Sequence, residues 1–413
     1  MADGDSTGAG TGIALALSGG GSRAMAFHLG CLRALRNAGL LDRITVISSV
    51  SGGSVLAALY CHTPGDFGAF EAKVRALLRR GFVRPTIWKM LNSAEGAKAL
   101  FYFLVIAGDR LTAFLVNQLL ALLHIRARTR IGWLKQSLIL RRASRTTILR
   151  KVFSSIFAGK PLSALRSDRP KLIIVACELQ TKSAFYFSAD QVASWRFGLA
   201  SPDDIEIAAA VSASAAYPLA LPAIDHRISF TSKDGVVSKR RVILTDGGVY
   251  DNLGLAPLWP DRDASISYHV SQYSRIIACR AGYGLEAAPA PSLAAARLTA
   301  VFESIFARAQ NFAIKRLFDL KAMGAIDDFL HPYLGQKDER LAYPPDDMIS
   351  ADEVAGYPTD FSAMPDDWIE RLVKRGEQVT HALLAEHWSS FTAKLDSDNK
   401  SRPSEKSPGH GDA

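Results

Sequence analysis

The chain has 413 residues, of which 48% are hydrophobic and 22% are charged, and its formal net charge is +9 at pH 7. This composition is that of a globular protein with a large core, and it excludes a mainly disordered chain, a collagen and a coiled coil. The positive charge is concentrated in residues 71–170, which hold 20 Lys and Arg against 4 Asp and Glu. The remaining residues hold 29 Lys and Arg against 36 Asp and Glu. Such a basic block suits an anionic surface, either a membrane or a nucleic acid.

The two ends of the chain differ in composition from the part between them. Residues 1–11 are rich in Gly, Ala, Asp and Ser, so we expect a flexible N-terminus without a Sec-type signal peptide. Residues 396–413 hold almost no apolar side chain and are predicted to form a disordered tail. Residues 12–395 are predicted to form a single domain. The four cysteines are scattered, which favours neither disulfides nor a zinc site and indicates a reducing compartment.

Short apolar runs predict strands, and segments with helical periodicity lie between them. The expected helices include residues 23–39, after a glycine cluster, and residues 52–61. Strands that alternate with helices favour a mostly parallel sheet with helices on both faces. The expected strands are at 12–17, 44–48, 171–177, 184–188, 241–245 and 275–280.

A long helical insert, at about residues 67–159, separates the second expected strand from the third. It contains two apolar runs, 99–108 and 111–125, with Asp109 and Arg110 between them. Each run is shorter than the roughly 20 residues that span a bilayer, and one helix through both would bury two charges near its middle. We therefore expect either a buried helical pair, or a lid or docking surface that meets lipid. A membrane anchor through 99–125 is a further alternative.

Basic clusters follow these apolar runs, at residues 126–130 and 141–145. The next segment has the pattern of an amphipathic basic helix. Such a helix either lies in a membrane interface or packs on the body of the protein, and the sequence leaves both open. Its apolar face comprises Ile148, Leu149, Val152, Phe153 and Ile156.

The first motif that points to a functional site is LSGGGSRAMAFHLG, at residues 17–30. A strand runs into three glycines and then into a helix. Glycines let the backbone bring successive N–H groups to one point, and the helix N-terminus adds partial positive charge. The place suits an anion, either a phosphate or a transition-state oxyanion. A dinucleotide site is less well supported. Such a site needs an acidic residue about 20 positions after the glycines, at the end of a strand, whereas Asp42 precedes a strand.

The second motif is ITVISSVSGGSVLAALY, at residues 44–60. A strand runs into a turn of small residues and then into a helix, which is the context of a nucleophile elbow. Ser51 is the candidate nucleophile. In the usual G-x-S-x-G pattern the first glycine is replaced here by Ser49, and Gly53 supplies the last. The rival nucleophiles are Ser48, Ser49 and Ser54.

The third motif is RVILTDGGVYDNLGL, at residues 241–255. An apolar strand delivers Asp246 to a turn that begins with Gly247 and Gly248. A carboxylate at the end of a strand, followed by a flexible turn, is well placed to act as a base in a cleft. Taken alone, an Asp-Gly turn is commonplace.

Together and in this order, the three motifs resemble the patatin-like phospholipase family, whose members carry a glycine-rich oxyanion loop, a G-x-S-x-G serine and a D-G-[GA] aspartate. Residues 160–179 and 208–223 also resemble the family, and the resemblance covers about residues 12–280. The family usually has glycine after the loop arginine, where this chain has Ala24; the Arg-Ala-Met order resembles the cytosolic phospholipase A2 group. The resemblance implies a three-layer α/β/α sandwich with a mostly parallel central sheet, plus the hydrophobic and basic helical insert.

The resemblance also implies a Ser–Asp dyad in place of a triad. Asp246 would take the proton from Ser51, which would attack an ester carbonyl and form an acyl-enzyme. Arg23 would orient the glycine loop or contact a substrate phosphate. No metal or other cofactor is implied. The predicted oxyanion loop comprises Gly19, Gly20, Gly21 and Ser22.

A Ser-His-Asp triad is the alternative mechanism. The chain order Ser…Asp…His would be met by Ser51, Asp246 and a later histidine. His269 and His331 are the candidates, because the other later histidines lie in a terminal helix or in the tail.

The sequence therefore predicts a lipid acyl hydrolase of the phospholipase A or lysophospholipase type that acts at a membrane surface. We expect a cytoplasmic, peripherally membrane-associated protein that docks on anionic lipid through residues 71–170. One alternative is a non-catalytic membrane-associated protein with the same fold. A nucleic-acid partner is not expected, because the basic block contains no recognised module and is too apolar for a duplex-binding face.

Overall fold

The structure is a computed structural model that describes residues 12–123, 139–218, 220–262, 268, 270, 272–283 and 294–393. The predictions for the N-terminus at 1–11, the tail at 396–413, the basic cluster at 126–130 and His269 fall outside the described residues.

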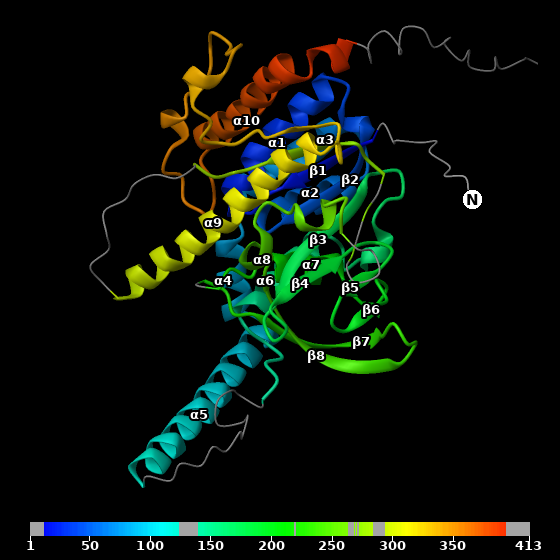
Figure 1. The fold of residues 1–413 in the computed structure, drawn as a ribbon. Helices are drawn as coiled ribbons and strands as arrows, with labels where there is room; N and C mark the ends of the chain where they lie inside the picture. The colour runs from blue at the N-terminus through cyan, green and yellow to red at the C-terminus, as the bar shows by residue number, and fades with distance from the viewer. Residues whose placement is uncertain are drawn as a thin grey trace, which may run out of the picture.

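A ten-stranded sheet forms the centre of the molecule (Figure 1). One half is parallel and follows the order β10 (Asp328–Leu330), β9 (Arg275–Cys279), β1 (Ile13–Leu17), β2 (Ile44–Val50) and β3 (Lys171–Glu178). The other half is antiparallel and continues through β4 (Ser183–Phe187), β5 (Val192–Ser194), β6 (Gly198–Ala200), β7 (Ile224–Thr231) and β8 (Val237–Asp246). The predicted α/β fold around a parallel sheet is confirmed, and the antiparallel half extends it.

Helices cover both faces of the parallel half, because the side chains of each strand alternate between two cores. In β1, Leu15 and Leu17 belong to the core on one face, whereas Ala14 and Ala16 belong to the core on the other. The first face carries α1 (Gly21–Asn37), α2 (Gly52–His62), α3 (Phe67–Arg80) and α10 (Asp366–His387). The second face carries α8 (Gly248–Asp251) and α9 (Ala294–Ala322), whose Leu317 packs into the second core. The result is the expected α/β/α sandwich.

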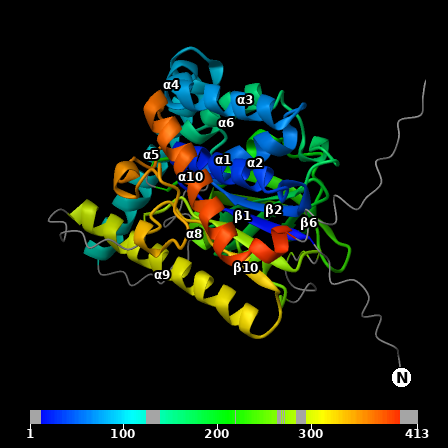
Figure 2. The ribbon, with the colours of Figure 1, turned by 90° about the horizontal axis from the view of Figure 1, so that it is seen from above.

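Helices α1 and α10 lie side by side on the first face of the sheet (Figure 2) and touch through glycines. A Cβ atom at Gly30 would lie 2.8 Å from the Glu377 backbone nitrogen and closer still to the Val373 carbonyl oxygen. A Cβ atom at Gly376 would meet the Phe27 backbone in the same way. The two helix backbones therefore approach more closely than any larger residue at these positions allows.

The insert forms α3, α4 (Val83–Leu91), α5 (Ala94–Leu122) and α6 (Arg145–Ile156). Helix α5 projects away from the body as one continuous helix (Figure 1). The predicted buried helical pair is therefore wrong. Asp109 and Arg110 do not break the helix; Arg110 is exposed, whereas Asp109 is half-buried. The apolar neighbours stay outside the core; Leu100 and Phe103 are 61% and 62% exposed.

Helix α6 resolves the alternative left open for the amphipathic segment. Ile148, Leu149, Val152 and Phe153 are buried, and the last three belong to the main core. Its neighbours are α4 and α7 (Ile207–Ser214). The apolar face of α6 is therefore part of the protein interior.

We predict that Gly30→Ala destabilises the fold by about 1–3 kcal/mol, because a methyl group at Gly30 would force α1 away from α10. Gly108→Ala on α5 is the matched control: no atom of the described residues lies within 4 Å of a Cβ atom there. That substitution should be neutral or stabilise by up to about 1 kcal/mol, because alanine favours a helix. Urea denaturation of both variants measures the two effects. Equal stability of Gly30→Ala and wild type would contradict the close contact.

Candidate active site

Strand β3 brings Ser51 and Asp246 together. Along one edge of β3, β2 pairs in parallel as far as Val50, which lies opposite Val175. From Ala176 onward β3 pairs with β8, and Asp246 lies opposite Ala176. At Ala176 the other edge of β3 is paired with β4. Strand β8 therefore pairs with the same edge of β3 as β2 does, beyond the point where β2 ends. Ser51 follows Val50, so it reaches β3 at the position where β8 ends.

The backbone at Ser51 forms a strained turn between β2 and α2. Ser51 has φ 51° and ψ −120°, a conformation that residues other than glycine rarely adopt. The turn lies directly against the glycine loop. A Cβ atom at Gly52 would collide with the Gly21 backbone, and one at Gly53 would lie 2.6 Å from the Ser18 carbonyl oxygen. The elbow therefore requires glycine at both positions after Ser51.

Asp246 is buried beside Ser51. The Ser51 side chain lies close enough to the Asp246 carboxyl to favour its ionised form. The Gly248 N–H donates to Asp246 Oδ1 at 2.7 Å. Burial raises the pKa of Asp246 to about 7, although the hydrogen bond from Gly248 and the Ser51 side chain each favour the ionised form. The carboxyl group therefore changes its charge close to neutral pH.

Two of the other serines of the elbow segment have different partners, and the Ser48 hydroxyl has none among the described residues. Ser49 Oγ donates to the Ile173 carbonyl oxygen at 3.2 Å, and Ser54 Oγ lies 2.9 Å from Ser214 Oγ. Ser48 is fully buried. Of these four serines, Ser51 is the one whose side chain lies close to the Asp246 carboxyl.

The glycine loop contains both occupied and unoccupied backbone donors. The Gly19 N–H donates to the Asn252 carbonyl oxygen at 3.1 Å, and the Ser22 N–H donates to the Asp360 carbonyl oxygen at 2.7 Å. Nothing among the described residues accepts a hydrogen bond from the N–H of Gly20 or Gly21. Their φ angles of 142° and 58° favour glycine. The loop also touches the elbow, since a Cβ atom at Gly19 would lie 3.2 Å from Ser51 Cβ.

Arg23 attaches the glycine loop to the C-terminal part of the chain. Its Nε donates to the Ala281 carbonyl oxygen at 3.0 Å, and its Nη1 donates to the Tyr357 carbonyl oxygen at 2.9 Å. The guanidinium lies 4.6 Å from the centre of the Tyr283 ring, and burial lowers its pKa. These hydrogen bonds connect the residue after the glycine loop to backbone carbonyls more than 250 positions away in the sequence.

His331, one of the two predicted triad histidines, has partners away from Asp246. Its Nδ1 lies 2.7 Å from the Ala278 carbonyl oxygen, and its ring stacks on Tyr333. Burial lowers the pKa of His331 to about 4, so the ring is neutral at physiological pH. His331 therefore does not complete a triad in this structure.

Helix α9 covers the turn that follows Asp246. A Cβ atom at Gly248 would lie 2.9 Å from Phe306 Cζ. Ser51 and Asp246 are only 8% and 4% exposed. The Phe306 side chain therefore lies over the turn after Asp246, and both Ser51 and Asp246 are buried.

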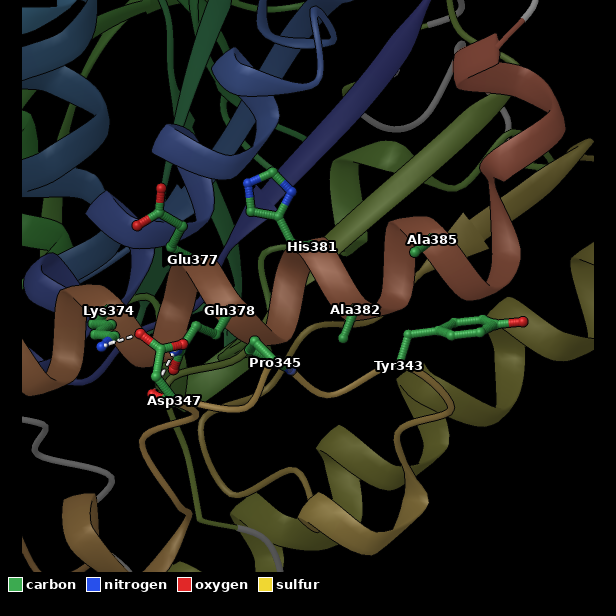
Figure 3. A pocket seen from close by; sticks show the side chains of 9 residues that line it. All are labelled: Tyr343, Pro345, Asp347, Lys374, Glu377, Gln378, His381, Ala382 and Ala385. Carbon is green, nitrogen blue, oxygen red and sulfur yellow. Dashed lines mark hydrogen bonds and ion pairs between the residues drawn. The ribbon is translucent and has the colours of Figure 1, made fainter.

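A surface hollow of about 520 Å³ lies elsewhere, along α10 (Figure 3). The segment that follows α10 contacts the start of β9: the Arg275 guanidinium lies 4.2 Å from the centre of the Phe391 ring. This is the amino end of the parallel strands, whereas Ser51 follows the carboxyl end of β2. Lys374 and Asp347 form an ion pair in the hollow. The hollow is therefore separate from the Ser51–Asp246 pair. Its lining residues are Tyr343, Pro345, Asp347, Lys374, Glu377, Gln378, His381, Ala382 and Ala385.

Two polar residues of the site were not predicted. Asn252 lies between the loops, since its Oδ1 would be 2.5 Å from a Cβ atom at Gly19 and 2.8 Å from one at Gly248. Ser214 contacts the elbow, because its Oγ accepts from the Ser51 N–H at 2.9 Å. Asn252 lies in the third motif and Ser214 in the segment 208–223, but neither residue type stands out there without knowledge of the contacts.

Within the parts of the chain that the structure describes, no group of three or more His, Cys, Asp or Glu residues is arranged to hold a metal ion. The buried Asp251 carboxylate caps the local backbone: its Oδ1 accepts from Leu253 and Gly254 N–H groups, each at 3.1 Å.

The sequence matches the family described as patatin-like phospholipase over residues 15–259, which is more than half of the chain. No curated protein matches the sequence. Human GIVD cytosolic phospholipase A2, in complex with an inhibitor and terbium chloride, is similar over 95% of this chain and 60% of its own, at 13% identity and a TM-score of 0.50. VipD from Legionella pneumophila is similar over 92% of this chain and 67% of its own, at 15% identity and a TM-score of 0.39. This chain thus spans less than two thirds of the human enzyme, and at these identities the likeness concerns the fold alone.

We predict that Asp246→Asn changes the pH dependence of stability. A carboxyl whose pKa is raised on folding stabilises the fold at low pH and loses that contribution as the pH rises through the folded pKa. The pKa is about 7 in the folded state, so the free energy of unfolding of the wild type should fall by about 2–3 kcal/mol between pH 5 and pH 8, relative to that of Asp246→Asn. Urea denaturation at both pH values measures this difference. Asp319→Asn, on the exposed side of α9, is the control, and an equal pH dependence for all three proteins would contradict the buried carboxyl.

Proposed function

The chain belongs to the patatin-like phospholipase family, and we propose that it hydrolyses fatty acyl esters of lipids through a Ser51–Asp246 dyad. Membership of the family supports lipid acyl hydrolase activity. The observation that carries the dyad is that the strand pairings bring Ser51 and the buried Asp246 carboxyl to one point of β3. There the Ser51 side chain favours the ionised carboxyl.

In the proposed reaction, ionised Asp246 accepts the hydroxyl proton as Ser51 Oγ attacks the ester carbonyl carbon. The tetrahedral intermediate collapses, and the alcohol leaves with the proton from Asp246. A water molecule then attacks the acyl-enzyme while Asp246 takes its proton. This second step releases the fatty acid and returns the proton to Ser51. A pKa near 7 suits Asp246 to both accepting and returning a proton at neutral pH.

The oxyanion of each intermediate would be held by backbone N–H groups. We assign this role to Gly20 and Gly21, whose N–H groups have no acceptor among the described residues, and to Gly52, which begins α2 next to Ser51. Gly19 and Ser22 were also predicted donors, but their N–H groups are occupied by backbone carbonyls. Arg23 would support the loop and not contact the substrate, because its guanidinium is engaged with the C-terminal segment.

The site would act at a membrane surface, because two helices expose apolar side chains that the core does not use. Helix α5 has 29 residues and a mean hydropathy of 1.8 over its most apolar 18-residue stretch, of which 11% is buried. By length and composition it could cross a membrane. Helix α9 exposes Ile305 and Phe312, 64% and 60% exposed, and carries Phe306 above the turn after Asp246. Lipid contact by α9 would therefore lie next to the entrance of the dyad.

Basic residues near α5 would add attraction to anionic lipid. Lys98 and Arg110 lie on α5 itself, and Arg142 and Arg145 lie close to the start of α6. Charges of this kind strengthen the binding of an apolar helix to anionic membranes.

We predict that Ser51→Ala and Asp246→Asn each lower fatty-acid release from mixed phosphatidylcholine–phosphatidylserine vesicles by roughly a thousandfold or more. His269→Ala and His331→Gln should retain activity, since a dyad needs no histidine. Circular dichroism confirms that each variant is folded. An inactive Asp246→Asn together with an inactive histidine variant would favour the triad, and an active Asp246→Asn would refute both the dyad and a triad that contains Asp246. A wild type that binds vesicles without hydrolysis would identify a non-catalytic protein with this fold.

We predict that replacing Leu100, Phe103 and Leu104 by Glu weakens vesicle binding at least about tenfold, because three apolar side chains lose a lipid environment. All three are at least 59% exposed, so the fold should not change. Val236→Glu with Val237→Glu is the matched control on an exposed apolar pair of the β7–β8 turn. Vesicle co-sedimentation at low and high salt measures binding. Unchanged binding by the triple variant, or equally tight binding of the wild type to duplex DNA, would refute docking through α5.

A further inference from the structure

The end of helix α7 contacts both halves of the Ser51–Asp246 pair. Ser214, the last residue of α7, is fully buried. Its Oγ lies 2.9 Å from the Ser51 backbone nitrogen and 2.6 Å from the Val175 carbonyl oxygen. Its own carbonyl oxygen accepts from the Gly247 N–H at 3.2 Å. One residue thus holds the elbow with its side chain and the turn after Asp246 with its backbone.

The direction of each hydrogen bond at Ser214 follows from the number of its protons. A serine hydroxyl has one proton and two acceptor sites. The proton must go to the Val175 carbonyl oxygen, which can only accept. The Ser51 N–H therefore donates to Ser214 Oγ, and the Ser54 hydroxyl, 2.9 Å away, donates to it as well. All three hydrogen-bonding sites of Ser214 are filled.

The residues that follow α7 hold Asp246 in turn. The Ala216 carbonyl oxygen accepts from the Asp246 N–H at 3.1 Å and from Thr245 Oγ1 at 2.8 Å. Residues 214–216 therefore bind the backbone on both sides of the dyad and also bind β3 at Val175. Val175 is the β3 residue opposite Val50, so the anchor lies next to the elbow.

We propose that Ser214 is a positioning residue, which holds the strained Ser51 backbone so that the Ser51 hydroxyl meets Asp246. This inference rests on the proposed function of the dyad. Ser51 has a positive φ, and a backbone in that conformation persists only where its surroundings hold it. The acceptor that Ser214 offers to the Ser51 N–H is the contact that holds it.

Ser212 provides a matched control on the same helix. It is also a fully buried serine, but its Oγ donates to the Ala208 carbonyl oxygen at 2.7 Å, within α7. Ser212→Ala and Ser214→Ala remove the same atom from neighbouring positions in the core. They differ in whether that atom touches the elbow.

The test compares the kcat, KM and pH profile of these variants for fatty-acid release from the vesicles above. Ser214→Ala should lower kcat by about 10- to 100-fold with KM changed less than twofold, because the nucleophile is misplaced. It should also move the midpoint of the kcat/KM profile to higher pH, since the Ser51 side chain favours ionised Asp246. Ser212→Ala should leave both quantities within twofold of wild type. Ser214→Cys keeps the side-chain volume, and a comparable loss in this variant separates the lost hydrogen bonds from a cavity.

Equal effects of Ser212→Ala and Ser214→Ala, or an unchanged pH profile in Ser214→Ala, would overturn the positioning role. A wild type without hydrolysis would refute the proposed function. Crystal structures of the wild type and of Ser214→Ala test the role of Ser214 independently of activity. In Ser214→Ala the Ser51 φ should leave the positive region or the Ser51 side chain should move away from Asp246. An elbow that keeps its wild-type geometry in Ser214→Ala would refute the inference.

Discussion

The exchange of partners along one edge of β3 is the constraint on which the site depends. Strand β2 leaves this edge after Val50, and β8 joins it from the opposite direction at Asp246. Parallel and antiparallel halves of the sheet meet at that point. Two residues almost 200 positions apart in the sequence become neighbours because both are in register with the same strand. A shift of one residue in either pairing would point Ser51 or Asp246 to the opposite face.

Two energetically unfavourable features lie next to each other at this point of β3. Ser51 has a backbone conformation that costs on the order of 1–3 kcal/mol, and Asp246 has a carboxyl group removed from water. The surroundings that stabilise them are short-range: glycines that allow backbone contact at Gly52 and Gly53, and hydrogen bonds from Gly248 and Ser214. In the proposed dyad, the strained turn would present the nucleophile and the raised pKa would suit Asp246 to act as the base.

The basic insert combines two helices with opposite roles. Helix α6 buries its apolar face in the core, whereas α5 leaves most of its apolar side chains outside. Both segments are apolar and flanked by basic residues in the sequence. The difference arises because α6 packs beside α7, whose last residue, Ser214, contacts Ser51 and Gly247, while α5 extends beyond the body (Figure 1). The helix that supports the site and the helix proposed to meet lipid are thus consecutive in the chain.

Local patterns in the sequence determined the parts of this protein that depend on neighbours in the chain. The glycine loop, the elbow at Ser51, the Asp-Gly turn and the strands that precede them follow from residue types at close spacing. Strands β5, β6, β7 and β10 were not predicted; three of these four have only three residues, and short strands leave little periodic signal. The tertiary structure alone decided which donors of the loop are occupied, that His331 turns to Ala278, that α5 projects as one helix, and that Ser214 contacts Ser51. The first, second and fourth of these depend on contacts between segments distant in the chain, and α5 projects because most of its length lacks such contacts. Neither the presence nor the lack of such contacts leaves a periodic or local signal in a single sequence.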